Sequence, residues 1–383
     1  MFDTLISFIR EQYRTQEFIP LHAPVFLGHE RDYVVDTIES TFVSSVGAFV
    51  DRFERDMASY TGSPRAVATV NGTAALHIAL KLVGVGQGDL VITQPLTFIA
   101  TCNAIAYCSA EPLFIDVDRQ TLGLCPAAMD TWLQEHAFLD DDGLCRTRLS
   151  QKVIRASVPM HTFGHPAALD ELVAVCQRWN IALVEDAAES LGSLYKGQHT
   201  GTFGAVGILS FNGNKIMTTG GGGMILAGEA LGQHAKHLTT TAKKPHPYEY
   251  VHDEVGYNYR LPNLNAALGC AQLEQLDKFI EAKRELAQRY DAQLAGGSLQ
   301  FVKEPEGCRS NYWLNAVICE GLEQRQALLK ATNDNGVMTR PIWQLMNHLP
   351  MYENAIKGDL TNAEWLAARI VNLPSSVLPE FHA

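Results

Sequence analysis

The 383-residue sequence has little positive charge and no long hydrophobic run. Lys and Arg total 30 against 42 Asp and Glu, which gives a formal net charge of −12. Nucleic acids and anionic membranes both attract clustered cations, so neither is expected as the main partner. No stretch approaches the roughly 20 apolar residues of a membrane-spanning helix. The sequence therefore argues against a nucleic-acid-binding protein and against a membrane protein.

Paired cysteines and a secretory leader are also missing. The eight cysteines never form a Cys-x-x-Cys pair, and several lie in apolar runs such as VAVCQ and AVICE. This favours buried, reduced thiols, with a zinc or disulfide framework as the alternative. The first ten residues, MFDTLISFIR, lack the basic start and long apolar middle of a secretory signal and suit a short amphipathic arm. We expect a cytoplasmic protein.

The composition is that of a folded chain, with 46% hydrophobic and 19% charged residues. Between residues 66 and 212, short apolar stretches rich in β-branched residues alternate with helical patterns. The predicted strands are 66–70, 89–95, 111–118, 152–160, 181–188 and 207–212, and the predicted helices are 71–84, 98–110 and 167–180. Such alternation predicts an α/β fold with a mainly parallel sheet covered on both faces.

The pattern changes after about residue 245. Residues 263–294 predict one long helix, which would bridge two domains. Shorter elements follow, with strands around 299–304, 312–319 and 337–343 and helices at 323–336 and 362–373. We predict an N-terminal arm at 1–24, a large α/β domain at 25–245 and a smaller C-terminal α+β domain at 246–383.

The first motif with chemical meaning is VNGTAAL at residues 70–76, a strand end followed by a turn of small residues and a helix start. The free N–H groups of a helix N-terminus favour an anionic phosphate. The stretch lacks the lysine of a P-loop and the glycines of a dinucleotide site. Taken alone, it is more typical of an ordinary helix cap than of a phosphate site.

Two further motifs follow predicted strands. Asp186, in VEDAAES, ends the strand IALV, and catalytic groups of open α/β sheets gather at strand carboxyl ends. The alternative is an Asp that caps the next turn. Ser210 and Lys215 precede the run TTGGGG, with no other charge within five residues of the lysine. Such a lysine can become a nucleophilic amine, although a solvated surface lysine is the usual role.

Together these motifs follow the order found in fold-type I enzymes of pyridoxal 5′-phosphate (PLP). The sequence resembles the DegT/DnrJ/StrS family of sugar-nucleotide aminotransferases from about Pro20 to Pro374. EDAAES, SFNGNK with TTGGGG, and GYNYRLPNLNAALG are the most diagnostic stretches, and PLTFIATCNAI and VPMHTFGHPAALDEL also match. The resemblance implies a three-layer PLP transferase with a smaller C-terminal α+β domain.

The resemblance assigns cofactor roles to individual residues. Lys215 matches the lysine that forms the Schiff base, and Asp186 matches the carboxylate that pairs with the pyridinium nitrogen. Phe98 matches the aromatic side chain stacked on the cofactor ring. Glu189 stands where many relatives carry Gln near the phenolic oxygen, a departure that recurs in the branch acting on 4-keto-6-deoxy N-acetylamino sugars. The stretches SNYWLN and MTRPIW also look like that branch.

Four more residues match the phosphate site of the family. Gly72 and Thr73 correspond to the backbone cradle, and Ser210 corresponds to a hydroxyl on the same phosphate. Asn258, in GYNYRLP, matches a residue that reaches the phosphate from the partner subunit. The resemblance therefore implies a homodimer with active sites shared between its subunits.

The implied reaction moves an amino group from L-glutamate, through PLP and pyridoxamine 5′-phosphate, to C4 of a nucleotide-linked 4-keto-6-deoxy sugar. We expect a UDP-linked 2-acetamido sugar on a route to bacterial surface glycans such as lipopolysaccharide. A dehydratase or lyase on the same scaffold and a C3-aminotransferase of the family are the alternatives. Some relatives become dehydratases by replacing the lysine with His, so the retained Lys215 favours transamination.

Substrate contacts are harder to place. Arg340 is a candidate for a diphosphate or carboxylate, because a guanidinium binds either in a bidentate way. His348, Tyr312 and Trp313 are candidates for the same cleft, and His161 lies at a strand end near it. Structural packing is the alternative for each of them. The carboxylates at 140–142 are expected in a solvated loop, so no metal site is predicted.

Overall fold

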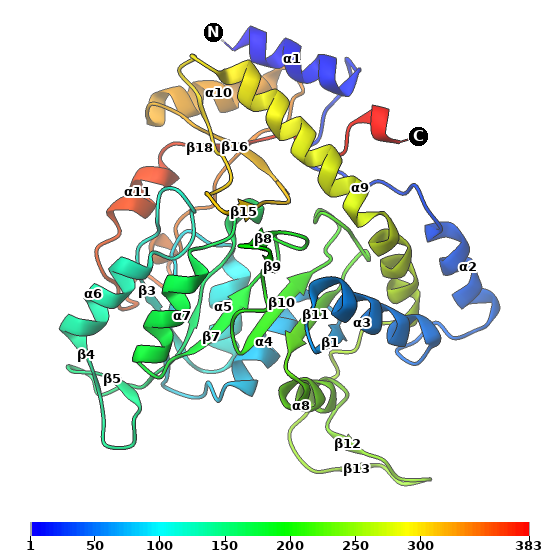
Figure 1. The fold of residues 1–383 in the computed structure, drawn as a ribbon, viewed down its shortest axis with the longest axis vertical. Helices are drawn as coiled ribbons and strands as arrows, with labels where there is room; N and C mark the ends of the chain where they lie inside the picture. The colour runs from blue at the N-terminus through cyan, green and yellow to red at the C-terminus, as the bar shows by residue number, and fades with distance from the viewer. Residues whose placement is uncertain (1, 383) are drawn as a thin grey trace.

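A seven-stranded sheet forms the centre of the larger part of the molecule in the computed structural model, which describes residues 2–382 (Figure 1). Only β11 runs antiparallel to its neighbours, and all other neighbouring strands in this sheet are parallel. The predicted mainly parallel sheet is confirmed. In spatial order its strands are β1 (Arg65–Thr69), β11 (Gly223–Ala227), β10 (Val206–Ser210), β7 (Ala182–Asp186), β6 (Ile154–Val158), β2 (Leu90–Thr93) and β3 (Glu111–Phe114).

Helices cover both faces of this sheet. Alternate strand residues point to opposite faces, so Val67 packs in a different cluster from its neighbours Ala66 and Ala68. The face of Val67 is covered by α4 (Gly72–Leu82), α5 (Ile99–Tyr107) and α8 (Glu229–Thr239). The other face is covered by α3 (Ala48–Thr61), α6 (Pro126–His136), α7 (Leu169–Arg178) and the first half of α9 (Asn263–Leu294). The result is a three-layer α/β arrangement.

A second, antiparallel sheet lies in the C-terminal part. Its order is β14 (Gln300–Phe301), β16 (Asn315–Ile318), β18 (Ile370–Leu373) and β17 (Arg340–Pro341). α1 (Asp3–Tyr13), α10 (Leu322–Asp334) and the second half of α9 pack on it in one hydrophobic cluster. The predicted arm therefore contains a helix built into the C-terminal core. The predicted long helix matches α9, whereas the domain limits at residues 24 and 245 stay a prediction.

One predicted element is partly wrong. Residues 362–373 were expected to form a single helix, but α11 (Thr361–Ala367) ends early and residues 370–373 form β18. Ile370, Val371 and Leu373 are fully buried, and β18 pairs with β16 and β17. β-Branched residues with partners on both sides fit a central strand better than a helix. Pairing with strands more than 25 residues away overrides the local helical pattern.

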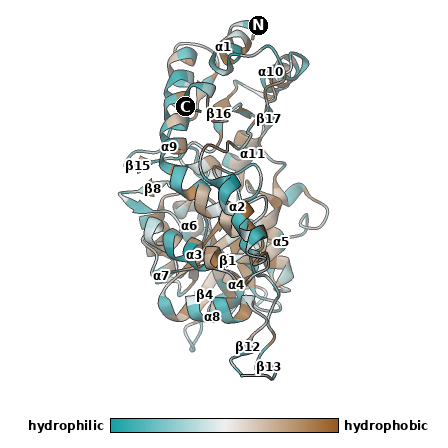
Figure 2. Cartoon of the chain, turned by 90° about the vertical axis from the view of Figure 1, so that its right-hand side faces the viewer, coloured by the Kyte–Doolittle hydropathy of each residue, from teal (hydrophilic) through white to brown (hydrophobic). Residues whose placement is uncertain are grey.

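The remaining elements are short and lie in the connections. A hairpin of β12 (Lys243–Lys244) and β13 (Val251–His252) projects from the end of the molecule opposite to α1 and α10 (Figure 2). The others are α2 (Glu30–Glu39), β4 (Ala137–Leu139), β5 (Cys145–Thr147), β8 (Leu194–Tyr195), β9 (Gln198–His199), β15 (Cys308–Arg309) and the 3-10 turns Thr162–Gly164, Met346–His348 and Pro379–Phe381. The carboxylates at 140–142 lie in the turn between β4 and β5, where Asp140 pairs with Arg146.

The predicted state of the cysteines agrees with the structure. All eight are free thiols, and six of them are buried. Over residues 2–382, no helix combines the length and the apolar character that crossing a bilayer requires.

Candidate active site at the strand carboxyl ends

A cavity of about 290 Å³ opens where the parallel strands β7 and β10 end beside the start of α4. Two tryptophans from the C-terminal part, Trp313 and Trp343, complete its wall. The structure brings seven of the eight predicted cofactor residues to this cavity. They are Gly72, Thr73, Phe98, Asp186, Glu189, Ser210 and Lys215.

Lys215 lies between a carboxylate and an aromatic ring. Its Nζ is 3.3 Å from Oε1 of Glu189 and 4.0 Å from the centroid of the Trp313 ring. The other carboxylate oxygen of Glu189 accepts a hydrogen bond from the backbone N–H of Phe163 at 2.9 Å. Burial raises the pKa of Glu189, and the charge of Lys215 opposes that rise. The Lys215 side chain is 12% exposed and lines the cavity, while its neighbours hold the amine in place.

Asp186 is the second buried carboxylate of the cavity. Its Oδ2 accepts a hydrogen bond from the hydroxyl of Thr101 at 2.7 Å, and its Oδ1 accepts one from the N–H of Ala188 at 3.2 Å. Burial raises the pKa of Asp186, although these two hydrogen bonds and the charge of Lys215 lower it. A cation bound next to this carboxylate would stabilise its ionised form by direct attraction.

The start of α4 provides an anion site. The side chain of Asn71 caps the helix by accepting from the N–H of Ala74 at 2.7 Å, so the helix-cap interpretation is correct. The N–H groups of Gly72 and Thr73 precede the first intrahelical bonds and stay available to a ligand. Gly72 is required here because a Cβ would lie 2.9 Å from the Cβ of Ser210. The absence of a side chain at Gly72 lets the Ser210 side chain lie against the helix N-terminus.

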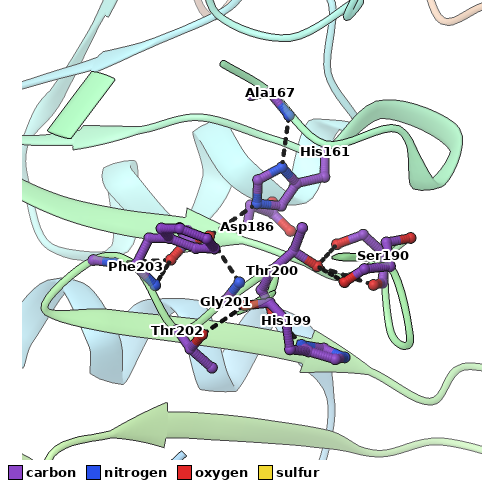
Figure 3. Close-up of polar contacts among 12 residues, drawn as sticks. His161, Ala167, Asp186, Ser190, His199, Thr200, Gly201, Thr202 and Phe203 are labelled. Carbon is purple, nitrogen blue, oxygen red and sulfur yellow. Dashed lines mark hydrogen bonds and ion pairs between the residues drawn. The ribbon is translucent and has the colours of Figure 1, made fainter. Parts of the chain in front are cut away.

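A buried hydrogen-bonded carboxylate supports the strand that carries Asp186. Glu185 accepts hydrogen bonds from Nε2 of His161 at 3.1 Å and from three backbone N–H groups, those of Gly201, Phe203 and Gly204, at 2.6–2.8 Å. Figure 3 shows the His161 ring between Ala167 and the turn at 201–203. Nδ1 of His161 accepts from the N–H of Ala167, so Nε2 carries the proton given to Glu185.

The loop at residues 310–315 connects the C-terminal part to the cavity. The Asn311 amide donates to the backbone oxygens of Glu189 and Leu191, both at 2.9 Å, and its Oδ1 accepts from the N–H of Trp313 at 2.8 Å. The buried amine of Lys283 donates to the Trp313 carbonyl at 3.1 Å and to the Ser375 carbonyl. Burial lowers the pKa of Lys283 to about 7. These bonds fix the Trp313 ring above Lys215.

Five predicted residues lie elsewhere. His161 is fully buried, and both ring nitrogens are hydrogen-bonded, which matches the packing alternative. The Tyr312 hydroxyl accepts from the N–H of Glu304, and its ring packs against Phe301. The other three are exposed and line no part of this cavity: His348 pairs with Glu364, Arg340 donates to Asn333, and Asn258 accepts from Arg260. The cavity gives no support to substrate contacts by Tyr312, Arg340 or His348 within a single chain.

Trp343 and Thr101 are two of the lining residues that were not among the predicted site residues. Trp343 lies in the flagged stretch MTRPIW, three residues after Arg340, and its ring packs 5.3 Å from Phe163 and 6.4 Å from Phe98. Thr101 lies in the flagged stretch TFIAT, one turn after Phe98, and meets Asp186 across 85 positions of the sequence. The motifs located both segments, but only the fold shows which side chains face the cavity.

These features together fit one cofactor. The free N–H groups at the start of α4 and the Ser210 hydroxyl suit a phosphate, the buried Asp186 suits a ring cation, and Phe98 offers an aromatic face to a planar ring. Lys215 supplies an amine that can attack an aldehyde. The fold and the site define a PLP-dependent enzyme of fold type I.

Comparison with known proteins narrows this class. The profile of the DegT/DnrJ/EryC1/StrS aminotransferase family matches residues 27–379, and the chain belongs to this family. It is 35% identical to GDP-perosamine synthase of Escherichia coli O157:H7 over 360 residues, covering 94% of this chain and 93% of that protein. It is 36% identical over 341 residues to the putative PLP-dependent aminotransferase EpsN of Bacillus subtilis, covering 88% and 84%.

A solved structure agrees with this assignment. The aminotransferase TlmJ from Streptoalloteichus hindustanus superimposes with a TM-score of 0.84 at 28% identity, covering 94% of this chain and 93% of that one. The predicted fold, family and cofactor are therefore confirmed. The protein is a PLP-dependent aminotransferase.

Proposed function

We propose that the protein transfers an amino group from L-glutamate to C4 of a nucleotide-linked 4-keto-6-deoxy sugar. The observation that carries this proposal is the placement of the Lys215 amine in one cavity with Asp186 and the open N-terminus of α4. When bound, PLP supplies the electron sink that transamination needs. The residues of this chain supply binding, orientation and proton transfer.

Lys215 is the proposed proton carrier. Its amine can take a proton from the donor carbon and return one to C4 of the sugar, provided that the amine is neutral when it accepts. Glu189, 3.3 Å away, can hold the amine in place and share its proton. The Trp313 ring, above the same amine, excludes water from that side. Lys215 therefore lies between the Glu189 carboxylate and an aromatic ring that keeps water away, which suits repeated proton transfer.

Three other groups hold the cofactor in this proposal. Asp186, fixed by Thr101, keeps the ring nitrogen protonated and so strengthens the electron sink. Ser210 and the N–H groups at the start of α4 bind the phosphate. Phe98 is 47% exposed at the cavity, so its face is open to a planar ring. These contacts retain the cofactor while Lys215 is engaged in proton transfer.

The acceptor is the least constrained part of the proposal. Glu189 and the stretches SNYWLN and MTRPIW favour a UDP-linked 2-acetamido sugar, as in the branch that the sequence resembles. Relatives named GDP-perosamine synthase favour an amino sugar carried on GDP. Both acceptors carry a 4-keto group on a 6-deoxy ring, so the reaction is the same and only the nucleotide and C2 substituent differ.

Incubation of the PLP-loaded protein with L-glutamate alone should convert its absorbance from the pyridoxal to the pyridoxamine form. Addition of UDP-2-acetamido-4-keto-6-deoxyhexose or GDP-4-keto-6-deoxymannose should then restore the first spectrum and yield an amino sugar, identified by mass spectrometry. A product that has lost a hydroxyl group and gained no nitrogen would instead show the dehydratase alternative. Full conversion of the spectrum by glutamate, with no turnover of any keto sugar, would contradict the proposed acceptor but not the donor half-reaction.

We also propose that two chains share their active sites. Asn258 is exposed and absent from the cavity of its own chain, as a residue acting on a partner would be. Large apolar side chains are exposed on α2 and the loop after it, including Ile38, Phe42 and Val46, the last of which is 71% exposed. Val46 shares a surface cleft with Arg260, close to Asn258 in the chain. A second copy covering this surface would remove it from water.

Co-expression of Lys215→Ala with Asn258→Ala chains tests this arrangement. Half of randomly formed dimers contain one chain of each kind, and each such dimer has one intact site of two if Asn258 acts on its partner. About a quarter of wild-type activity should therefore return. If Asn258 acts within its own chain, no site is intact and no activity returns. Separately purified variants, mixed without subunit exchange, provide the baseline.

A further inference from the structure

A cluster of metal-ligating side chains lies outside the lining of the cavity, where α8 meets the β12–β13 hairpin (Figure 1). His234 and His237 lie one turn apart on α8, and Asp253 and Glu254 directly follow β13. Nε2 of His237 is 2.7 Å from Oδ1 of Asp253 and 3.7 Å from Oε1 of Glu254. Nε2 of His234 is 2.9 Å from the same Glu254 oxygen.

The spacing of these atoms suits a small tetrahedral ion. The ligand atoms of zinc, about 2.0–2.1 Å from the metal, stand roughly 3.3 Å apart. The three distances here, 2.7, 2.9 and 3.7 Å, lie on both sides of that value. The ligand atoms of His237, Asp253 and Glu254 all fall within 4.8 Å of one another. His234 lies outside this group of three and contacts it through the Glu254 oxygen.

We propose that His237, Asp253 and Glu254 form a zinc site with one imidazole and two carboxylate ligands, and that His234 orients Glu254 by its hydrogen bond. Imidazole and carboxylate are both zinc ligands, and the two carboxylates balance the charge of the ion. The imidazoles are held at fixed spacing on one face of α8, because residues three apart lie on the same side of a helix. Lys244 pairs with Oδ2 of Asp253 at 3.3 Å, which leaves Oδ1 directed at His237.

The site would clasp the hairpin to the body of the molecule. The hairpin has only two pairs of facing strand residues, Lys243 with His252 and Lys244 with Val251. Its tip carries Tyr248 and Tyr250, both 82% exposed. A metal bound by one residue of α8 and two residues just beyond β13 would fix the returning arm of the hairpin. The site is independent of the proposed aminotransferase chemistry, because none of its ligands lines the cavity.

Titration of zinc chloride into the tag-free, cofactor-loaded protein tests the site by calorimetry. We expect one zinc ion per chain, and His234→Ala and His237→Ala should each weaken binding at least about tenfold. His246→Ala is the matched control, because His246 lies on the same hairpin, pairs with Glu249 outside the proposed site and should leave binding unchanged. Cobalt in place of zinc should give the intense visible absorption of a tetrahedral site in the wild type and in His246→Ala only.

Two results would overturn the proposal. One is a wild-type protein that takes up no more zinc than the His234→Ala/His237→Ala double variant, since the remaining uptake would then belong to other groups such as the thiols. The other is a loss of zinc binding in His246→Ala as large as that in His237→Ala. All three histidines are on the surface, and equal melting temperatures without zinc would show that the variants are folded.

Discussion

Replacement of Lys215 by alanine is expected to lower kcat for transamination by about 10³-fold or more. The proposed reaction needs this amine both to engage the cofactor and to carry the proton, and no other amine lines the cavity among the described residues. Steady-state assays with L-glutamate and the keto sugar measure the loss. Borohydride reduction of the wild-type holoenzyme should also attach the cofactor to Lys215, as peptide mass spectrometry would show.

Lys215→Arg is the informative companion. Arginine keeps a positive charge near Glu189 but cannot release its proton near neutral pH. The variant therefore distinguishes the role of the positive charge from the role of proton transfer. We expect this variant to be as inactive as Lys215→Ala while it retains more thermal stability. Lys303→Ala, at an exposed lysine outside the cavity, should behave as the wild type. If Lys215→Arg kept a tenth of wild-type kcat, the proton-transfer role of Lys215 would be wrong.

Glu185→Ala is expected to lower the free energy of unfolding by about 3–5 kcal/mol. The fully buried carboxylate accepts hydrogen bonds from His161 and from three backbone N–H groups in the turn at 201–204, and alanine leaves all four donors without a partner. Thermal and urea unfolding of the wild type and the variant under identical conditions measure the change. Glu229→Ala is the control. That carboxylate is exposed, so its loss should hardly change the free energy of unfolding.

The Glu185 carboxylate also determines how the stability of the folded protein should change with pH. Burial opposes ionisation of Glu185, but the hydrogen bonds from His161 and from the backbone N–H groups outweigh it and lower its pKa from the usual 4.5. The unfolded chain therefore binds this proton at higher pH than the folded protein does. The stabilisation is complete above about pH 4.5 and is lost as the pH falls below that value. Acid unfolding should therefore lose part of its pH dependence in Glu185→Ala. An unchanged acid midpoint and slope would contradict this account.

The main sheet and the long helix could be predicted from the sequence, because their signals are local. The β-branched runs ending at Thr69, Asp186 and Ser210 are strands, and residues 263–294 form α9 as expected. β18 could not be predicted in this way. Ile370 and Val371 continue an apolar pattern that fits a helix, and only β16 and β17, distant in the sequence, turn them into a central strand.

The site follows the same division between local and distant signals. Asp186 and Ser210 each end a strand, and strands of a parallel sheet end at one edge, so their meeting with the start of α4 was predictable. For the adjacent aromatic residues Tyr312 and Trp313, the sequence did not predict which ring faces the cavity. Trp313 turns to the cavity, whereas Tyr312, with a φ of 44°, packs among Phe301 and His165. The direction of each ring depends on a backbone conformation that the letters NYW do not encode.

The two tryptophans of the cavity are attached to different parts of the molecule. Asn311 ties the Trp313 backbone to the segment that carries Glu189, so these two neighbours of Lys215 belong to one rigid unit. Trp343 lies on a separate segment after β17, and its ring packs against those of Phe98 and Phe163. Substitutions at position 343 can therefore change the shape of the pocket as related enzymes diverge. The positions of Glu189 and Trp313 around the Lys215 amine would stay the same.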